Sequence, residues 1–177
     1  MKISVVGNSG SGKTTAARTM SERLALAHLE LDSVRHQPGW EELPDDRFAA
    51  RVNAFMDAHD AWVIDGNYSV IQERIWERAN TVVWLDVPFG ENMRNIVWRT
   101  LRRVVMRKEL WNGNRERWSN LFSLDPYRSV IAWAWTRHGV YRRRYGAARE
   151  DPRWDHLRFV RIDSRDALDR WVAHARR

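Results

Sequence analysis

A run of small and polar residues near the start of the chain, GNSGSGKTT at positions 7–15, has the composition of a phosphate-binding loop. Gly7, Gly12, Lys13 and Thr14 satisfy the spacing G-x-x-x-x-G-K-[ST]. In such a loop the backbone N–H groups point at phosphate oxygens, the lysine bridges the β- and γ-phosphates, and the threonine hydroxyl reaches Mg²⁺. The residues predicted to bind a nucleotide here are Gly7, Asn8, Ser9, Gly10, Ser11, Gly12, Lys13, Thr14 and Thr15.

The residues on either side of this loop fit the same interpretation. The apolar run KISVVG, residues 2–7, is typical of a short buried strand. After the loop, Ala17, Met20, Leu24 and Ala27 recur at helical spacing. A strand, a loop and a helix in this order form the context that the motif requires, which disfavours the alternative of a Gly/Ser loop without a ligand.

Alternating strand and helix signals continue to the end of the chain. The predicted strands are 3–6, 28–32, 61–65, 81–87 and 157–162. The predicted helices are 14–27, 45–59, 69–78, 90–107, 126–146 and 164–175, the fifth beginning with Asp125 as N-cap and Pro126 at the first helical position. Near-continuous apolar strands between helices predict an α/β fold with a parallel sheet covered on both faces. Residues 109–120, which include an Asn-Gly pair, are the best candidate for a loop.

Three aspartates, Asp32, Asp65 and Asp86, lie at the ends of predicted strands. Ligands of parallel sheets bind at the carboxyl ends of the strands, so we expect these acids beside the phosphate loop. For Asp86, in DVPFGEN, the favoured interpretation is a turn acid. For Asp65 the alternatives are Mg²⁺ binding, since a hard cation prefers oxygen ligands and keeps its waters, and a helix-capping or turn acid.

Length and composition favour a single soluble domain over residues 1–177. The absence of cysteine excludes disulfides and thiol chemistry. The first predicted strand starts at once, which leaves no room for a secretory signal, and the longest apolar run, VIAWAW, is far shorter than a membrane span. We therefore expect a cytoplasmic protein without a membrane partner.

Charge is distributed unevenly along the chain. Residues 1–90 hold 9 basic and 13 acidic side chains, a net charge of −4, whereas residues 91–177 hold 21 and 10, a net charge of +11. Nearly all of the basic residues are arginines, whose planar guanidinium binds phosphate in a bidentate manner. The basic half indicates phosphates of a nucleotide or of a nucleic acid as partners, and a solvated surface is the alternative.

The chain resembles small P-loop kinases of the adenylate kinase-like group, and more closely the bacterial DNA topology modulation proteins, or adenylate kinase-related kinases. The resemblance is carried by GNSGSGKTT, LDSVRHQPGW, WVIDGNYS, VVWLDVP and LWNGNRE. It implies a P-loop NTPase fold of the nucleoside or shikimate kinase type, with helices on both faces of the sheet. It also implies a helical, arginine-rich lid over about 99–145.

The resemblance further implies roles for individual residues. Asp65, in WVIDGNY, would bind Mg²⁺ through water, while Thr14 would bind it directly. Asp32 would bind the acceptor and take its proton if the acceptor is a hydroxyl. Arg35 is placed like an arginine that grips an acceptor phosphate, and Trp40 would wall the acceptor pocket or simply pack.

Five further arginines match positions of adenylate kinases that contact the nucleotide or close over the phosphates. Arg94 is placed near an adenine-stacking arginine and Arg99 like a phosphate clamp, with Arg103 one turn on. Arg137 and Arg142 resemble arginines that follow the lid. Converging arginines suit phosphoryl transfer, which is mostly positioning and charge neutralisation. For each of them, a solvated or ion-paired side chain is the alternative.

The chain also departs from adenylate kinases. DGNYS lacks the Pro-Arg that normally follows, and there is no cysteine-rich lid, which argues against AMP as the acceptor. We predict an ATP- and Mg²⁺-dependent kinase with a small-molecule acceptor, the preference for ATP resting on the resemblance. The alternatives are a nucleic-acid-associated P-loop ATPase or regulator and a nucleotide-binding switch. Contact with nucleic acid is expected to be weak and non-specific.

Overall fold

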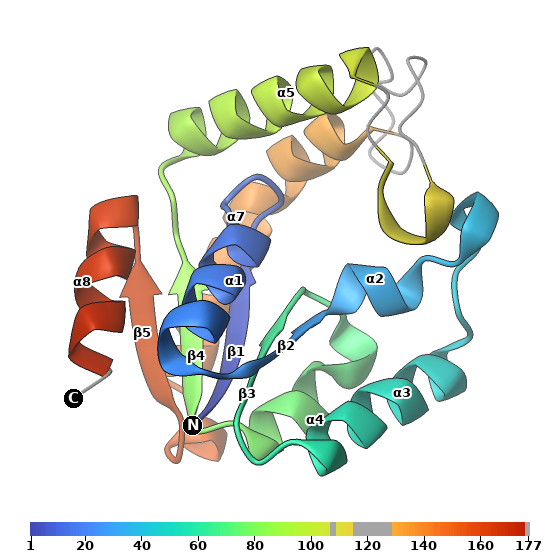
Figure 1. The fold of residues 1–177 in the computed structure, drawn as a ribbon. Coiled ribbons are helices and arrows are strands. Elements are labelled where there is room, and N and C mark those ends of the chain that lie inside the picture. Colours follow the sequence, from blue (N-terminus) through green and yellow to red (C-terminus); the bar gives the residue numbers. More distant parts are fainter. Residues whose placement is uncertain (107–108, 115–128, 176–177) are drawn as a thin grey trace.

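A computed structural model describes residues 1–106, 109–114 and 129–175 of the chain. Five strands form one sheet in the order β2-β3-β1-β4-β5, and every neighbouring pair is parallel (Figure 1). The strands are β1 (Lys2–Gly7), β2 (Ala27–Glu30), β3 (Trp62–Asp65), β4 (Thr81–Leu85) and β5 (Arg158–Ile162). This confirms the predicted parallel sheet.

Helices connect successive parallel strands. The α-helices are α1 (Lys13–Leu24), α2 (Leu31–Arg35), α3 (Asp45–Ala58), α4 (Ser69–Arg78), α5 (Phe89–Val105), α7 (Val130–Arg149) and α8 (Arg165–Ala175). Short 3₁₀ turns are η1 (Pro38–Trp40), η2 (Trp111–Gly113) and η3 (Pro152–Trp154).

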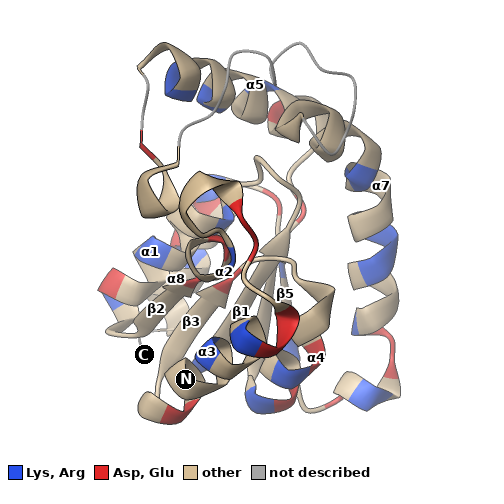
Figure 2. Cartoon of the chain, turned by 90° about the vertical axis from the view of Figure 1, so that its right-hand side faces the viewer, with Lys and Arg blue, Asp and Glu red and all other residues tan. Residues whose placement is uncertain are grey.

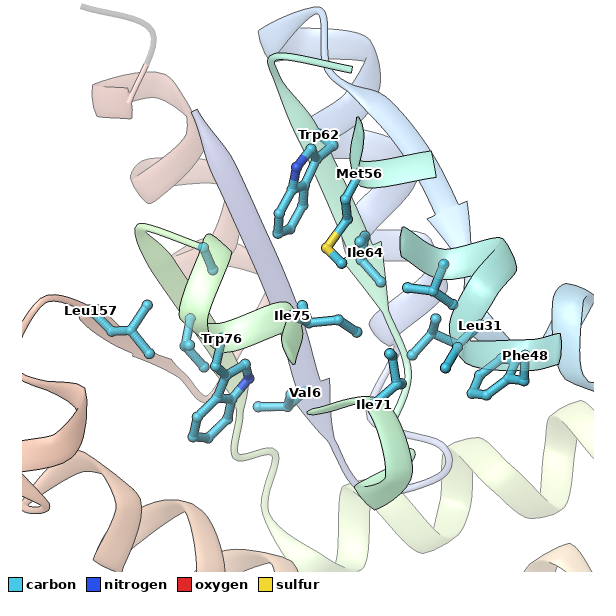
Figure 3. Packing of buried hydrophobic residues seen from close by; sticks show 14 of the residues in the cluster. Val6, Leu31, Phe48, Met56, Trp62, Ile64, Ile71, Ile75, Trp76 and Leu157 are labelled. Carbon is cyan, nitrogen blue, oxygen red and sulfur yellow. The ribbon is translucent and has the colours of Figure 1, made fainter. Parts of the chain in front are cut away.

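Each face of the sheet carries its own hydrophobic core, because successive strand side chains point in opposite directions. Val5 points into a core formed with α1 and α8, and Val6 into a larger core formed with α3, α4 and α7. Figure 3 shows the second core, where Trp76 of α4 lies near Val6 of β1. With both faces covered, the carboxyl edge of the strands is left for a ligand.

Two of the element boundaries that differ from those predicted have a physical explanation. The second strand ends at Glu30, and Asp32 lies in the first turn of α2, a helix of five residues too short for periodicity to reveal. Helix α7 begins at Val130, because the hydroxyl of Ser129 accepts a hydrogen bond from the N–H of Ala132 and caps it. The predicted start at Asp125 and Pro126 lies outside the described residues.

Among the described residues after position 90, most of the arginines lie on α5 and α7, where Figure 2 shows basic residues in blue. Over the part of the chain that the structure covers, no helix combines the length and apolarity needed to cross a membrane.

Candidate active site

The phosphate loop joins β1 to α1 through a backbone that only glycine adopts easily. Gly7, Gly10 and Gly12 have φ values of 149°, 86° and 88°. A Cβ on Gly7 would lie 2.6 Å from the carbonyl oxygen of Leu85, and one on Gly10 would lie 2.8 Å from Cβ of Ile96. These glycines therefore permit both the turn and the close approach of β4 and α5 to the loop.

Hydrogen bonds with α5 and α7 hold the loop in place. The amide of Asn92, fully buried on α5, donates to the carbonyl oxygen of Ser9 at 2.9 Å. The amide of Asn8 donates to the carbonyl oxygen of Ala134 on α7 at 2.8 Å, and its own oxygen accepts from the N–H of Ser9. Asn8 thus acts through its side chain in the loop's own architecture, as well as lying among the predicted nucleotide contacts.

The interior of the loop is ready for an anion. Helix α1 starts at Lys13 with no side-chain cap and no acid in its first turn, so its leading N–H groups are open to a ligand. The hydroxyl of Ser11 is buried with no hydrogen-bond partner in the described residues. Uncapped donors and a buried, unsatisfied hydroxyl are what a bound phosphate would satisfy.

The Lys13 ammonium folds back over the loop. Its Nζ donates to the carbonyl oxygens of Gly7 and Asn8, each at 2.9 Å. Burial lowers the pKa of Lys13 to about 8, while Asp32 and Asp65 nearby oppose that shift. Because burial destabilises the charged form of Lys13, a phosphate that enters the loop would stabilise the ammonium.

Beside the loop, the hydroxyl of Thr14 meets two carboxylates. Its Oγ1 lies 2.7 Å from Asp65 Oδ2 and 3.1 Å from Glu30 Oε1, so its one proton can go to either. Glu30 and Asp65 are register partners at the ends of β2 and β3. Thr14 and Asp65, which were both predicted to act on Mg²⁺, are thus in direct contact, and metal binding by the pair stays a prediction.

Glu30 and His28 are neighbours of this pair that the sequence analysis did not identify. His28 Nε2 lies 2.7 Å from the other oxygen of Asp65, which fixes the carboxylate. Two residues apart on β2, His28 and Glu30 point to the same face, and this alternation in HLE was the available signal. Groups of three or more acidic, histidine or cysteine ligands suited to a metal are absent from the described residues, so a cation here would need waters or phosphates as well.

Asp32 lies on α2, close enough to Lys13 for its charge to act on the ammonium. Its Oδ1 accepts a hydrogen bond of 2.7 Å from the hydroxyl of Tyr68, and His36 Nε2 lies 3.4 Å from that hydroxyl. Burial first, and then Asp32, raise the pKa of Tyr68 well above its usual value. Tyr68 therefore remains a donor to Asp32, and the Tyr of DGNY was the sequence signal for it.

The Arg35 guanidinium is bound to neighbouring residues of its own chain. Its guanidinium donates to Glu42 Oε2 at 2.6 and 3.1 Å, to Asp45 Oδ1 at 2.6 Å and to the carbonyl oxygen of Leu43 at 2.8 Å. It also lies over the ring of Phe48, with only 14% of its side chain exposed. In this geometry Arg35 fastens the α2–α3 connection, which disfavours the grip on an acceptor phosphate that the resemblance predicts for it.

Trp40 lies in an aromatic cluster with His36 and Trp111. The ring centroid of His36 is 5.4 Å from that of Trp40 and 5.7 Å from that of Trp111. Asn112 and Asn114 fasten η2 to this segment, the first donating to the carbonyl oxygen of His36 and the second accepting from the N–H of Trp40 at 2.9 Å. This part of the predicted loop 109–120 is therefore docked on η1, and residues 115–120 lie outside the described ones.

The predicted arginines of α5 divide between its two faces. Arg99 and Arg103 follow Asn92 by seven and eleven residues, which places them on the face that packs against the loop. Arg99 also lies close enough to act on the charge of Lys13. Arg94 is exposed on the opposite face, so the geometry does not favour its predicted stacking on a base.

The two predicted arginines of α7 have described partners. The guanidinium of Arg137 lies 4.5 Å from the ring centroid of Trp133 and one turn from Ala134, whose carbonyl binds the loop. Arg142 Nε lies 3.3 Å from Asp86 Oδ2, an oxygen that Arg161 also binds at 2.5 Å. Asp86 thus links the end of β4 to β5 and α7, which corrects its interpretation as a turn acid. Arg142 is ion-paired in the structure, and its role over the phosphates stays a prediction.

The comparisons with known proteins agree with this geometry. A family model described as an AAA domain, AAA_33, matches residues 3–170. Shikimate kinases from Synechococcus elongatus and from a second Synechococcus strain are each 24% identical over 140 residues, which cover 67% of this chain and 73% of theirs.

Two solved structures align over nearly the whole chain. A gluconokinase from Sinorhizobium meliloti has a TM-score of 0.51 at 18% identity and covers 98% of this chain and 94% of its own. A shikimate kinase from Acinetobacter baumannii, in complex with shikimate, has a TM-score of 0.53 at 16% identity, with coverages of 98% and 89%. At these identities they show the fold, which is the predicted P-loop kinase fold. None of the four bears on DNA topology modulation, and that part of the resemblance stays a prediction.

Proposed function

Because the chain belongs to the AAA_33 family of AAA domains and has the P-loop kinase fold, we propose that it transfers the γ-phosphoryl group of ATP to the hydroxyl of a small acceptor. The observation that carries this proposal is the meeting of three functions at one sheet edge. Lys13 lies in the loop, Thr14 bonds to Asp65, and Asp32 lies close enough to act on the charge of Lys13. A protein that only bound ATP as a switch would not need a carboxylate such as Asp32 beside the phosphate loop.

The residues present fit ATP with Mg²⁺. The uncapped start of α1 and the buried hydroxyl of Ser11 suit phosphate oxygens, with Lys13 as the cation. The Thr14 hydroxyl and the Asp65 carboxylate supply the hard oxygen donors that Mg²⁺ prefers, and Glu30 is a third candidate. When bound, Mg²⁺ neutralises charge on the phosphates and so favours transfer.

Asp32 is assigned to the acceptor hydroxyl. The Tyr68 hydroxyl occupies Oδ1, which orients the carboxylate and leaves Oδ2 for the acceptor. From that position Oδ2 takes the hydroxyl proton as the oxygen attacks phosphorus. Arg99 and Arg137, on helices that contact the loop, are assigned to neutralising charge on the transferred group. The lid expected over about 99–145 stays part of this proposal as the element that would bring them closer.

The acceptor side carries little that would bind an anion. Residues 31–46 hold five carboxylates and one arginine, and that arginine, Arg35, is already bound to Glu42 and Asp45. We therefore propose an acceptor without a phosphate or carboxylate at this end, in contrast to the shikimate of the solved relative. Aromatic rings at His36, Trp40 and Trp111 suit the apolar face of a neutral or amine-bearing polyol.

A matched pair of lysine variants tests the proposal. Lys13→Ala removes the cation of the loop, whereas Lys2→Ala removes a lysine at the other end of β1. Calorimetric titration with Mg-ATP and a transfer assay on a panel of hydroxyl metabolites are expected to show transfer lowered about 100- to 1,000-fold by the first change and unaltered by the second. Equal activity in both variants would contradict the proposal.

A weak association with nucleic acid is a second candidate, favoured by the arginines along α5 and α7. Phosphate contacts of this kind are blind to sequence and are lost steeply with salt. Gel shifts on random and defined duplexes at rising salt test this. Nanomolar, sequence-selective binding at physiological salt would favour the nucleic-acid-associated ATPase instead.

A further inference from the structure

Asn67, in the turn between β3 and α4, is bonded to the first peptide of the phosphate loop. Its Nδ2 donates to the carbonyl oxygen of Gly7 at 2.5 Å, and its Oδ1 accepts from the N–H of the same residue at 3.2 Å. A side-chain amide that meets both groups of one residue fixes that residue's orientation. Gly7 is also a residue whose carbonyl receives the Lys13 ammonium, so Asn67 touches the loop where its lysine is held.

Tyr145 of α7 fixes Asn67 in turn. Its hydroxyl donates to Asn67 Oδ1 at 3.0 Å. The two bonds to Gly7 determine which end of the amide is oxygen, so the tyrosine hydroxyl has to be the donor. Tyr145 has no exposed surface, and burial raises the pKa of its hydroxyl, which keeps the proton in place.

One face of α7 makes this contact and the bond to Asn8. Ala134, whose carbonyl oxygen accepts from the Asn8 amide, precedes Tyr145 by eleven residues, or three helical turns. Both residues are fully buried, and Tyr145 packs in the core formed with α3 and α4. Helix α7 therefore holds two successive loop residues, Asn8 directly and Gly7 through Asn67, from points about 16 Å apart along its axis.

We propose that Asn67 is a positioning residue of the phosphate loop and that Tyr145 acts through it. The affinity for ATP then depends on the position of α7 against the loop. The proposal rests on the proposed function, because it assigns the loop to ATP. The proposal also assigns a role to the segment DGNYS, which departs from the adenylate kinase pattern. The amide that follows the strand-end Asp65 and Gly66 reaches back to β1 instead of out to an acceptor.

The chain offers matched controls for both residues. Asn80 also bonds to the backbone of β1, since its Oδ1 accepts from the N–H of Lys2, but it does so at the opposite end of the strand. Tyr141 stacks on Tyr145 on the same helix, with ring centroids 5.8 Å apart. Asn80→Ala therefore removes an amide that bonds to the same strand, and Tyr141→Phe removes a hydroxyl from the same helix, with no described bond to the loop lost.

The experiment measures the KM for ATP, kcat and the melting temperature for Asn67→Ala, Tyr145→Phe, their double variant and the two controls. Asn67→Ala is expected to raise the KM for ATP about tenfold, and Tyr145→Phe about threefold, because one loses two bonds to the loop and the other one bond to Asn67. The KM for the acceptor and kcat should change much less. Calorimetric Kd values for ATP provide the same comparison without turnover.

Two results would overturn the inference. One is an unchanged ATP affinity in a folded Asn67→Ala protein, which would leave the residue with a merely structural role. The other is a Tyr145→Phe effect that persists in the Asn67→Ala background, because a residue acting through Asn67 has nothing left to act on there. If Asn67→Ala fails to fold, Tyr145→Phe, which keeps the ring, decides by its ATP affinity alone. Wild-type protein that binds no ATP would instead contradict the proposed function.

Discussion

The two sides of the candidate site are held in opposite ways. The phosphate side is a glycine-rich backbone fastened by the loop's own Asn8 amide and by the amides of Asn67 and Asn92, with its lysine held inside. The acceptor side is carboxylate-rich and aromatic, and its segments η1 and η2 are fastened to each other. Backbone fixed by buried amides suits a ligand that all relatives of the fold share. A side-chain surface suits the ligand by which they differ.

Backbone conformation shows the same contrast. On the phosphate side the left-handed positions are glycines, at Gly10 and Gly12, where they cost little. On the acceptor side Trp40 and Asn112 have φ values of 65° and 56°. A bulky aromatic residue in this region is strained, and strain of this kind persists only where neighbouring bonds enforce it. Here the amide of Asn114 supplies such bonds, to the N–H of Trp40 and the carbonyl oxygen of Gln37.

The largest expected effect comes from separating the two sides chemically. Asp32→Asn should lower the rate of transfer about 100-fold or more, because an amide cannot take the acceptor proton, and should leave ATP affinity unchanged. Single-turnover rates and ATP titrations measure the two quantities separately. Asp45→Asn, a carboxylate of the same side paired with Arg35, is the matched control and should keep its rate. A fall in ATP affinity in Asp32→Asn would show that the two sides are not separable.

The next effect is a pH dependence confined to the phosphate side. Lys13 has a pKa of about 8 in the free protein, and phosphates should raise it. Below pH 8 the ammonium is already formed and ATP affinity should be flat. Above pH 8 binding must take up a proton, so the affinity should fall by up to about tenfold for each pH unit.

Calorimetry in buffers of different ionisation enthalpy measures that proton uptake directly. The variant Lys13→Arg, whose guanidinium stays charged over this range, should remove both the uptake and the slope. A slope that persists in Lys13→Arg would assign the titration to another group.

The smallest effect on rate is expected at Arg35, although its effect on stability should be clear. Arg35→Met breaks the bonds to Glu42, Asp45 and the Leu43 carbonyl, at a cost of about 1–3 kcal/mol of unfolding free energy. Transfer should stay within about twofold of wild type, because the acceptor is not assigned to this guanidinium. Thermal unfolding and steady-state rates measure both, and a large loss of rate in a stable variant would restore Arg35 as an acceptor contact.

The sequence predicted the phosphate side better than the acceptor side, for a physical reason. Phosphate binding depends on backbone conformation, which the glycine spacing of the loop reports directly, and the loop follows β1 as expected. Side-chain partners are set by tertiary contacts that spacing does not encode. Neither the engagement of Arg35 with Glu42 nor that of Arg142 with Asp86 could be anticipated in this way.

The sequence analysis missed several residues of the site for the same reason, because their partners are set by tertiary contacts. Asn67 and Tyr145 are 78 positions apart, and no local pattern in either segment predicts their hydrogen bond. Glu30 was hidden by its position one residue before the α2 helix, which the short run LDSVR did not reveal. Alternation within β2 and the aromatic residue of DGNY were weak signals for His28 and Tyr68, and the aspartates beside them were easier to recognise as candidate site residues.

The most direct test of the account follows the γ-phosphoryl group itself. A small-metabolite extract is separated by ion exchange into anionic, neutral and cationic fractions, and each is incubated with Mg²⁺, γ-labelled ATP and the full chain, with Lys13→Ala as control. The account predicts label in an organic product from the neutral or cationic fraction, absent with Lys13→Ala. Label released only as inorganic phosphate from every fraction, with or without added DNA, would contradict it, and label transferred only in the anionic fraction would contradict its description of the acceptor side.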